Sequence, residues 1–151
     1  MPGPLHPYDL LKSIVQLSNA SLPAEGKLDQ MLQSLSVAFQ SDRCLFLKPE
    51  KIDKDGFLSR VASEKKPLWV EKGSSFRKEN VSPQEEDLLR PTFACIPLYQ
   101  GTSFQGILYI GFLKRDRFSP VETDLLLLIG EVMGGVIRNE DLHQKAEETI
   151  S

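Results

Sequence analysis

FACIPLY (residues 93–99) and FQGILYIGFL (residues 104–113) are two strongly apolar runs joined by the four residues QGTS (100–103). Apolar runs of this length, separated by a short segment that contains glycine, predict a β-hairpin. This hairpin is the clearest strand signal in the chain. Its register stays open, because a shift of one residue moves every side chain to the other face of the sheet.

The segments before the hairpin predict shorter elements. Residues 82–85 (SPQE) form a capping box with proline at the first helical position, so a short helix to about residue 90 is expected. Residues 43–48 predict a strand buried on both faces, and residues 67–71 predict a second, short strand. Residues 57–63 (FLSRVAS) fit either a helix or a strand, and we favour the helix. Residues 51–56 read as a charged turn and residues 73–80 as a loop.

Helices are predicted at both ends of the chain. Residues 8–18 and 25–40 carry apolar side chains at helical spacing. After the hairpin, Ser119 to Glu122 repeats the capping box with its proline and begins a helix that we expect to reach about residue 148. Two neighbouring stripes run along this last helix: Leu125, Leu128, Val132, Gly135, Asn139 and Leu142, and Leu126, Ile129, Met133, Val136 and Ile137. A helix that is apolar on two sides has to be covered twice, by the sheet and by a second helix or subunit.

This order of elements predicts an α+β fold, in which an antiparallel sheet carries the N-terminal helices and the long C-terminal helix on one face. The chain has 151 residues, of which 40% are hydrophobic and 26% charged, values ordinary for one globular domain. We expect residues 7–148 to form that domain, residues 1–6 to be an extended or disordered lead, and residues 149–151 to lead toward a possible output domain.

Composition excludes several classes of function. The net charge of −3 and the isoelectric point near 5.4 give no basic footprint for nucleic acid. The two cysteines, Cys44 and Cys95, lie apart in apolar stretches, and His6 and His143 lie near the two ends, so no metal site is expected. The N-terminus has no signal-peptide pattern, and the longest apolar run (residues 125–129) is too short to cross a bilayer. We therefore expect a cytoplasmic protein without membrane insertion.

Five motifs in the same order resemble those of a GAF domain, a small sensor module of signalling proteins. The paired strands are represented by CIPL (95–98) and GILYI (106–110), and the entry to the last helix by FSPVE (118–122) followed by Leu125 and Leu126. Residues 42–47 resemble the first strand, and residues 56–70 resemble a helix opened by glycine that leads to a Lys-Pro-Leu strand. The resemblance covers residues 8–145. The related PAS fold differs in placing its helices in the middle of the chain.

The resemblance implies a small-molecule pocket on the sheet face away from the terminal helices. Trp69, Phe93, Cys95 and Tyr109 are the candidate ligand-binding residues, because aromatic side chains with a polar end suit such a site. Core packing is the alternative reading of the same residues. The middle of the chain, between residues 48 and 56 and between 73 and 91, is shorter than in most members of the family. The Asn-Lys-Phe-Asp-Glu motif of nucleotide-responsive members is absent, and no cofactor is identified.

The resemblance favours a regulatory domain over an enzyme. We expect a homodimer formed through the first and last helices, with Leu11, Leu125, Leu128, Val132, Gly135 and Leu142 at the interface. The last helix would relay a signal to an output domain such as a histidine kinase. One alternative is a scaffold that dimerises and binds no ligand. Another is a thiol-dependent enzyme that uses Cys95, like the free methionine-R-sulfoxide reductases of this family. The Gly134-Gly135 pair destabilises a helix by about 1 kcal/mol per glycine relative to alanine, which calls for close packing against a dimer partner or against the chain's own first helix.

Overall fold

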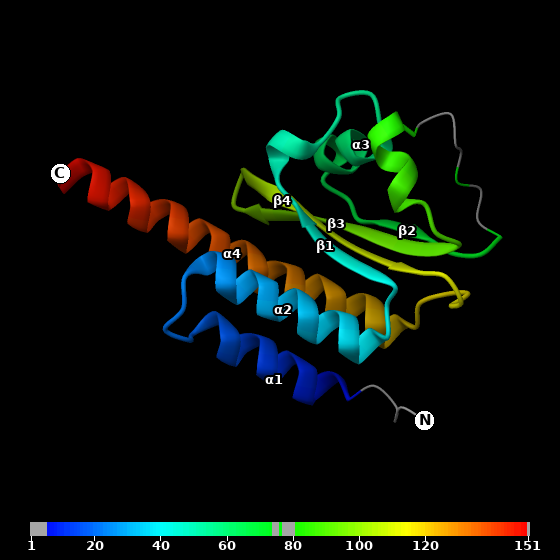
Figure 1. Cartoon of the computed structure of the whole chain (residues 1–151), viewed down its shortest axis with the longest axis horizontal. Coiled ribbons are helices and arrows are strands. Elements are labelled where there is room, and N and C mark those ends of the chain that lie inside the picture. The colour runs from blue at the N-terminus through cyan, green and yellow to red at the C-terminus, as the bar shows by residue number, and fades with distance from the viewer. Residues whose placement is uncertain (1–5, 74–75, 77–80, 151) are drawn as a thin grey trace.

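The computed structural model describes residues 6–73, 76 and 81–150, and the side chains within the final helix only as far as residue 139. A four-stranded antiparallel sheet in the order β1-β4-β3-β2 separates two layers (Figure 1). Its strands are β1 (Arg43–Leu47), β2 (Leu68–Val70), β3 (Thr92–Gln100) and β4 (Ser103–Phe112). The predicted α+β fold is therefore confirmed.

Three helices cover one face of the sheet. Helices α2 (Ala24–Phe39) and α4 (Pro120–Ile150) contact strands, and α1 (Pro7–Ser18) packs against both of them (Figure 1). The second apolar stripe of α4 faces the sheet, since Leu126, Ile129 and Met133 are fully buried. This is the arrangement that the two-stripe pattern predicts. The lead at residues 1–5 and Ser151 lie outside the described residues.

Among the described residues, the opposite face carries α3 (Phe57–Glu64) and the short 3₁₀ helices η1 (Pro49–Lys51) and η3 (Pro83–Leu88). Residues 57–63 are thus helical, as favoured, and their Phe57, Leu58 and Val61 are buried against the sheet. The segment after Ser82 forms a 3₁₀ helix in place of the short helix expected there. We call this side of the sheet the α3 face. It includes the sheet residues that α3 and η3 cover.

The β3–β4 hairpin is confirmed with a tighter turn than expected. Only Gly101 and Thr102 lie between the strands, and Gly101 has a φ of +64°, a conformation that glycine adopts without steric cost. The register pairs Ile96 with Leu108 and then shifts between Leu98 and Tyr99, so Gln105 is an extra residue with no partner. This β-bulge was not predicted from the sequence.

Position 134 favours glycine because the end of the β3–β4 hairpin packs closely against α4 there. A Cβ atom at Gly134 would lie 3.2 Å from the amide nitrogen of Gln100, whereas one at Gly135 would meet nothing within 4 Å. The close packing at Gly134 within the chain is therefore with the end of β3 and not with the first helix.

Candidate functional site

The structure separates the four residues predicted to line a pocket. Phe93, Cys95 and Tyr109 lie together on the α3 face, where Cys95 and Tyr109 are opposite one another on β3 and β4. Trp69 pairs with Ala94 on β2 and β3, and directly opposed residues share a face. Trp69 therefore lies on the helix-covered face, where its ring contacts that of Phe118 at a centroid distance of 5.4 Å.

The α3 face is filled by aromatic rings at this position. The ring of Phe93 lies 5.7 Å from that of Phe57, 5.6 Å from that of Phe76 and 5.9 Å from that of Tyr109. Phe93 is only 1% exposed and Tyr109 is fully buried. Two of the four residues expected to line a pocket, Phe93 and Tyr109, thus belong to a packed cluster, which we call the aromatic cluster: Phe57, Phe76, Phe93 and Tyr109.

Tyr109 is fixed at its polar end as well. Its hydroxyl donates a hydrogen bond to the backbone carbonyl of Leu88 at the end of η3. Burial raises the pKa of this hydroxyl above its usual value, so it stays protonated and remains a donor at neutral pH. Gly111 lies on the same strand, and no larger residue fits there, because a Cβ atom would lie 2.2 Å from the Tyr109 oxygen. The hydrogen bond ties the sheet to the layer that covers it.

A buried carboxylate holds this covering layer together. Glu85, 2% exposed, accepts hydrogen bonds from the backbone N–H groups of Phe57, Leu58 and Ser82, each at 3.0 Å. It therefore caps the first turn of α3 while it caps its own 3₁₀ helix, and negative charge is favourable at both N-termini. A Cβ atom at Gly56 would come 1.9 Å from this carboxylate, so glycine makes room for it. The capping box was predicted for the local helix, but its contact with α3 was not.

The two cysteines are placed as core residues. Cys95 is fully buried on the α3 face, and Cys44 is partly buried on the helix-covered face. Burial raises the pKa of the Cys44 thiol to about 12, and burial together with the nearby Glu85 raises that of Cys95. Thiolate is the reactive form, so both environments suppress nucleophilic chemistry.

Both thiols are therefore expected to react slowly in the folded protein. A pKa of about 12 leaves only about one thiol in ten thousand ionised at pH 8. We expect labelling by a disulfide reagent such as Ellman's reagent to take hours under native conditions. In guanidinium chloride, both cysteines should react within seconds to minutes. Labelling of native Cys95 as fast as that of free glutathione would contradict this and favour the thiol-dependent enzyme.

The residues predicted for a dimer interface are only partly available. Leu128 is 47% exposed, and Val132, Gly135 and Leu11 are half-buried. Leu125 is 4% exposed and belongs to the chain's own core, so it is removed from that surface. The side chain of Leu142 lies outside the described residues. Leu128 thus remains the most accessible apolar side chain of the predicted set.

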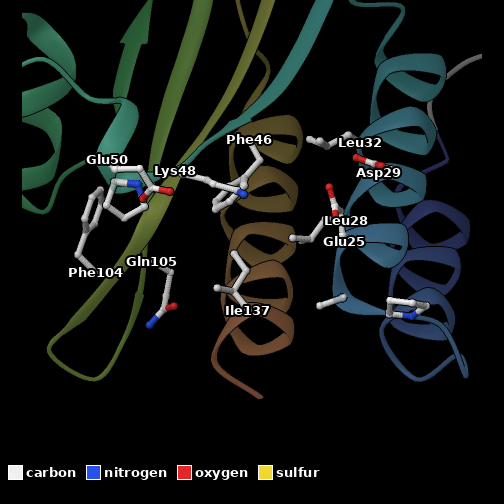
Figure 2. Close-up of a pocket in the computed structure, with 13 residues that line it drawn as sticks. Glu25, Leu28, Asp29, Leu32, Phe46, Lys48, Glu50, Phe104, Gln105 and Ile137 are labelled. Atoms are coloured by element: carbon white, nitrogen blue, oxygen red, sulfur yellow. The ribbon is translucent and has the colours of Figure 1, made fainter. Parts of the chain in front are cut away.

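A groove opens at the β1 edge of the sheet, between α2 on one side and η1 with the start of β4 on the other (Figure 2). It encloses about 630 Å³. Four regions of the chain line it: α2 with the residues just before it, β1 with η1, the start of β4, and α4. The side chains are Pro23, Ala24, Glu25, Leu28, Asp29, Leu32, Phe46, Lys48, Pro49, Glu50, Phe104, Gln105 and Ile137. None of them was a predicted site residue. The sequence feature that could have indicated this groove is the isolated Gly106, because a glycine within a strand often marks a β-bulge.

Solved structures with the same fold carry several kinds of function. The GAF domain of an Acinetobacter phosphoenolpyruvate-protein phosphotransferase is 20% identical, with a TM-score of 0.75 over 89% of this chain and 94% of that one. Free methionine-R-sulfoxide reductase from Neisseria meningitidis is 11% identical, with a TM-score of 0.72 over 91% of each chain. The phycocyanobilin-bound GAF domain of a cyanobacterial phytochrome is 12% identical, with a TM-score of 0.70 over 93% of this chain and 98% of that one.

These likenesses show that the chain has the GAF fold, as its motifs predicted. The sequence matches no protein-family model and no curated protein. Among the described residues, no helix is long and apolar enough to cross a membrane. Signalling domains and reductases both occur among the structural neighbours, so the fold alone does not choose between them.

Proposed function

We propose that this chain is a regulatory GAF-fold domain that pairs with a second copy through α1 and α4 and transmits the state of the pair along α4. The proposal rests on an exposed apolar side chain on the surface of α4. This helix of 31 residues buries one stripe against the sheet, yet Leu128 beside that stripe is 47% exposed. Helix α1 packs against α4, and its Val15 is 40% exposed. Exposed apolar side chains on two neighbouring helices are what an association surface requires.

The course of α4 supports the relay. Its C-terminal part extends beyond the sheet and the other helices (Figure 1). A helix that is packed on the domain at one end and free of it at the other can pass a rotation or shift to an output domain, such as a histidine kinase. Two such helices side by side in a dimer would carry the signal together.

The filled α3 face favours the version of this proposal in which no ligand binds there. The aromatic cluster occupies the space that the family resemblance assigned to a pocket, and Tyr109 is hydrogen-bonded to the covering layer. A dimerisation scaffold needs no cavity at this position. The thiol-dependent enzyme is disfavoured by the buried, high-pKa setting of both cysteines.

Leu128→Asp is expected to weaken the dimer by at least about tenfold. A charge at the centre of an apolar interface loses the buried leucine and must itself be desolvated, which together exceeds about 1.4 kcal/mol. Sedimentation equilibrium across the micromolar range measures the dissociation constant. Val37→Asp is the matched control, because Val37 is a 72% exposed apolar residue on α2, outside the proposed surface. A wild-type chain that stays monomeric at several hundred micromolar would overturn the pairing, as would equal weakening by both variants.

A further inference from the structure

We propose that the groove between α2 and β1 is a binding site for a small organic cation, an ammonium or guanidinium group on an apolar body. The site lies at the β1 edge of the sheet and shares no lining residue with the aromatic cluster. Its volume of about 630 Å³ is within the range of about 300–1,000 Å³ typical of small-molecule sites. The proposal does not depend on whether the chain dimerises.

The shape of the groove is built by the β-bulge. Because Gln105 is an extra residue between the paired Phe104 and Gly106, the alternation of side chains along β4 is broken at the groove. Gly106 has a φ of +139°, and a Cβ atom there would lie 2.5 Å from the ring of Phe46. Glycine thus lets Phe46, a lining residue, pack directly on the backbone of β4.

The walls of the groove suit an apolar body. Leu28 and Leu32 come from α2, Phe46 from β1 and Ile137 from α4, and all four are half-buried. Contact with four such side chains removes apolar surface of both ligand and protein from water. Lining from several elements, rather than one flat face, indicates a site that surrounds a small molecule.

The charge of the groove selects the sign of the ligand. Three carboxylates, Glu25, Asp29 and Glu50, line it against the single ammonium group of Lys48. Figure 2 shows Glu25 and Asp29 extending from α2 toward the strands. Within the part of the chain that the structure describes, these three acids form no ion pair. The uncompensated negative charge favours a cation.

The acids are not arranged for a metal ion. No three of the described His, Cys, Asp and Glu side chains come together closely enough to hold one. An organic cation needs no such convergence, since its charge is spread over several N–H donors that can point to separate acceptors. The site therefore fits an amine or a guanidine better than a divalent ion.

Gln105 supplies a further acceptor. Its side chain is at the groove although the residue is only 5% exposed, and its Nε2 donates to Ser103 Oγ at 3.0 Å. Its amide oxygen accepts no hydrogen bond from any described residue and is not among the fully buried atoms, so it is open to water. An ammonium or guanidinium N–H in the groove can take the place of that water and donate to this oxygen.

The first test is a titration of the full chain with 4-phenylbutylamine, in which the NMR shifts of the backbone amides are measured at each concentration. We expect saturable shifts with a millimolar dissociation constant at low salt, confined to α2, β1, the start of β4 and the middle of α4. The isosteric anion 4-phenylbutyrate should produce no such set of shifts. Shifts that are scattered over the surface, or equal for amine and carboxylate, would overturn the proposal.

The second test removes the charge without changing the shape. In the double variant E25Q/D29N, the dissociation constant for 4-phenylbutylamine should rise roughly fivefold, as expected for two partly exposed ion pairs. Because Glu25 also lies in the first turn of α2, the unfolding midpoint is measured alongside to confirm an intact fold. The matched control D124N/E131Q removes the same charge from the exposed face of α4, away from the groove, and should leave binding unchanged. Equal weakening in both double variants would assign the effect to net charge and reject the site.

Discussion

Replacing Glu85 by alanine is expected to lower the free energy of unfolding by about 3–4 kcal/mol, one of the largest effects of any single substitution in this chain. Three buried backbone N–H groups, those of Phe57, Leu58 and Ser82, would lose their acceptor at once. Each unsatisfied buried donor costs about 1–3 kcal/mol, although water entering the space left by the side chain recovers part of this. The melting temperature should fall by roughly 10 °C.

Urea unfolding followed by circular dichroism measures this loss. Glu86→Ala is the matched control: Glu86 is adjacent on η3, is exposed and makes none of these hydrogen bonds, so its loss should cost under about 0.5 kcal/mol. Glu85→Gln should fall between the two, since one amide oxygen can still accept while the NH₂ group faces donors. A loss for Glu85→Ala as small as that for Glu86→Ala would mean that the carboxylate does not join α3 to η3.

The contrast between Glu85 and Glu86 shows where sequence reasoning ends. The spacing of Ser82 and Glu85 predicts a capping box, because that motif depends on residues three apart. The contacts with Phe57 and Leu58 join residues 28 and 27 positions apart, which no local pattern encodes. The helices and the hairpin were predictable for the same reason that the capping box was, since each is set by the spacing of neighbouring residues.

Trp69 illustrates the second kind of limit. Its identity and its strand were predicted, but its face depends on the register of β2 against β3, which are separated by the whole of η3. With Trp69 opposite Ala94 rather than Cys95, the predicted pocket residues divide between two cores. The groove was missed for a related reason, because it is formed by residues from four separate parts of the chain around a bulge at Gln105.

Phe93 is the residue at which the filled α3 face is best tested. Phe93→Ala is expected to lower the free energy of unfolding by about 3–5 kcal/mol, because it removes a ring in contact with three others and leaves a cavity. A cavity lined by apolar side chains stays dry and can bind a small aromatic molecule. Indole or benzene should therefore raise the melting temperature of this variant.

The wild-type chain is expected to respond differently, and this difference decides between a closed core and a ligand pocket. If the aromatic cluster fills the α3 face, neither indole nor benzene should stabilise the wild-type chain, because stabilisation requires a site in the folded state. Phe93→Leu is the matched control, since it keeps most of the volume and should cost under about 1.5 kcal/mol without opening a cavity. Stabilisation of the wild-type chain as large as that of Phe93→Ala would show an existing cavity on the α3 face and would favour a ligand-binding domain over a ligand-free scaffold.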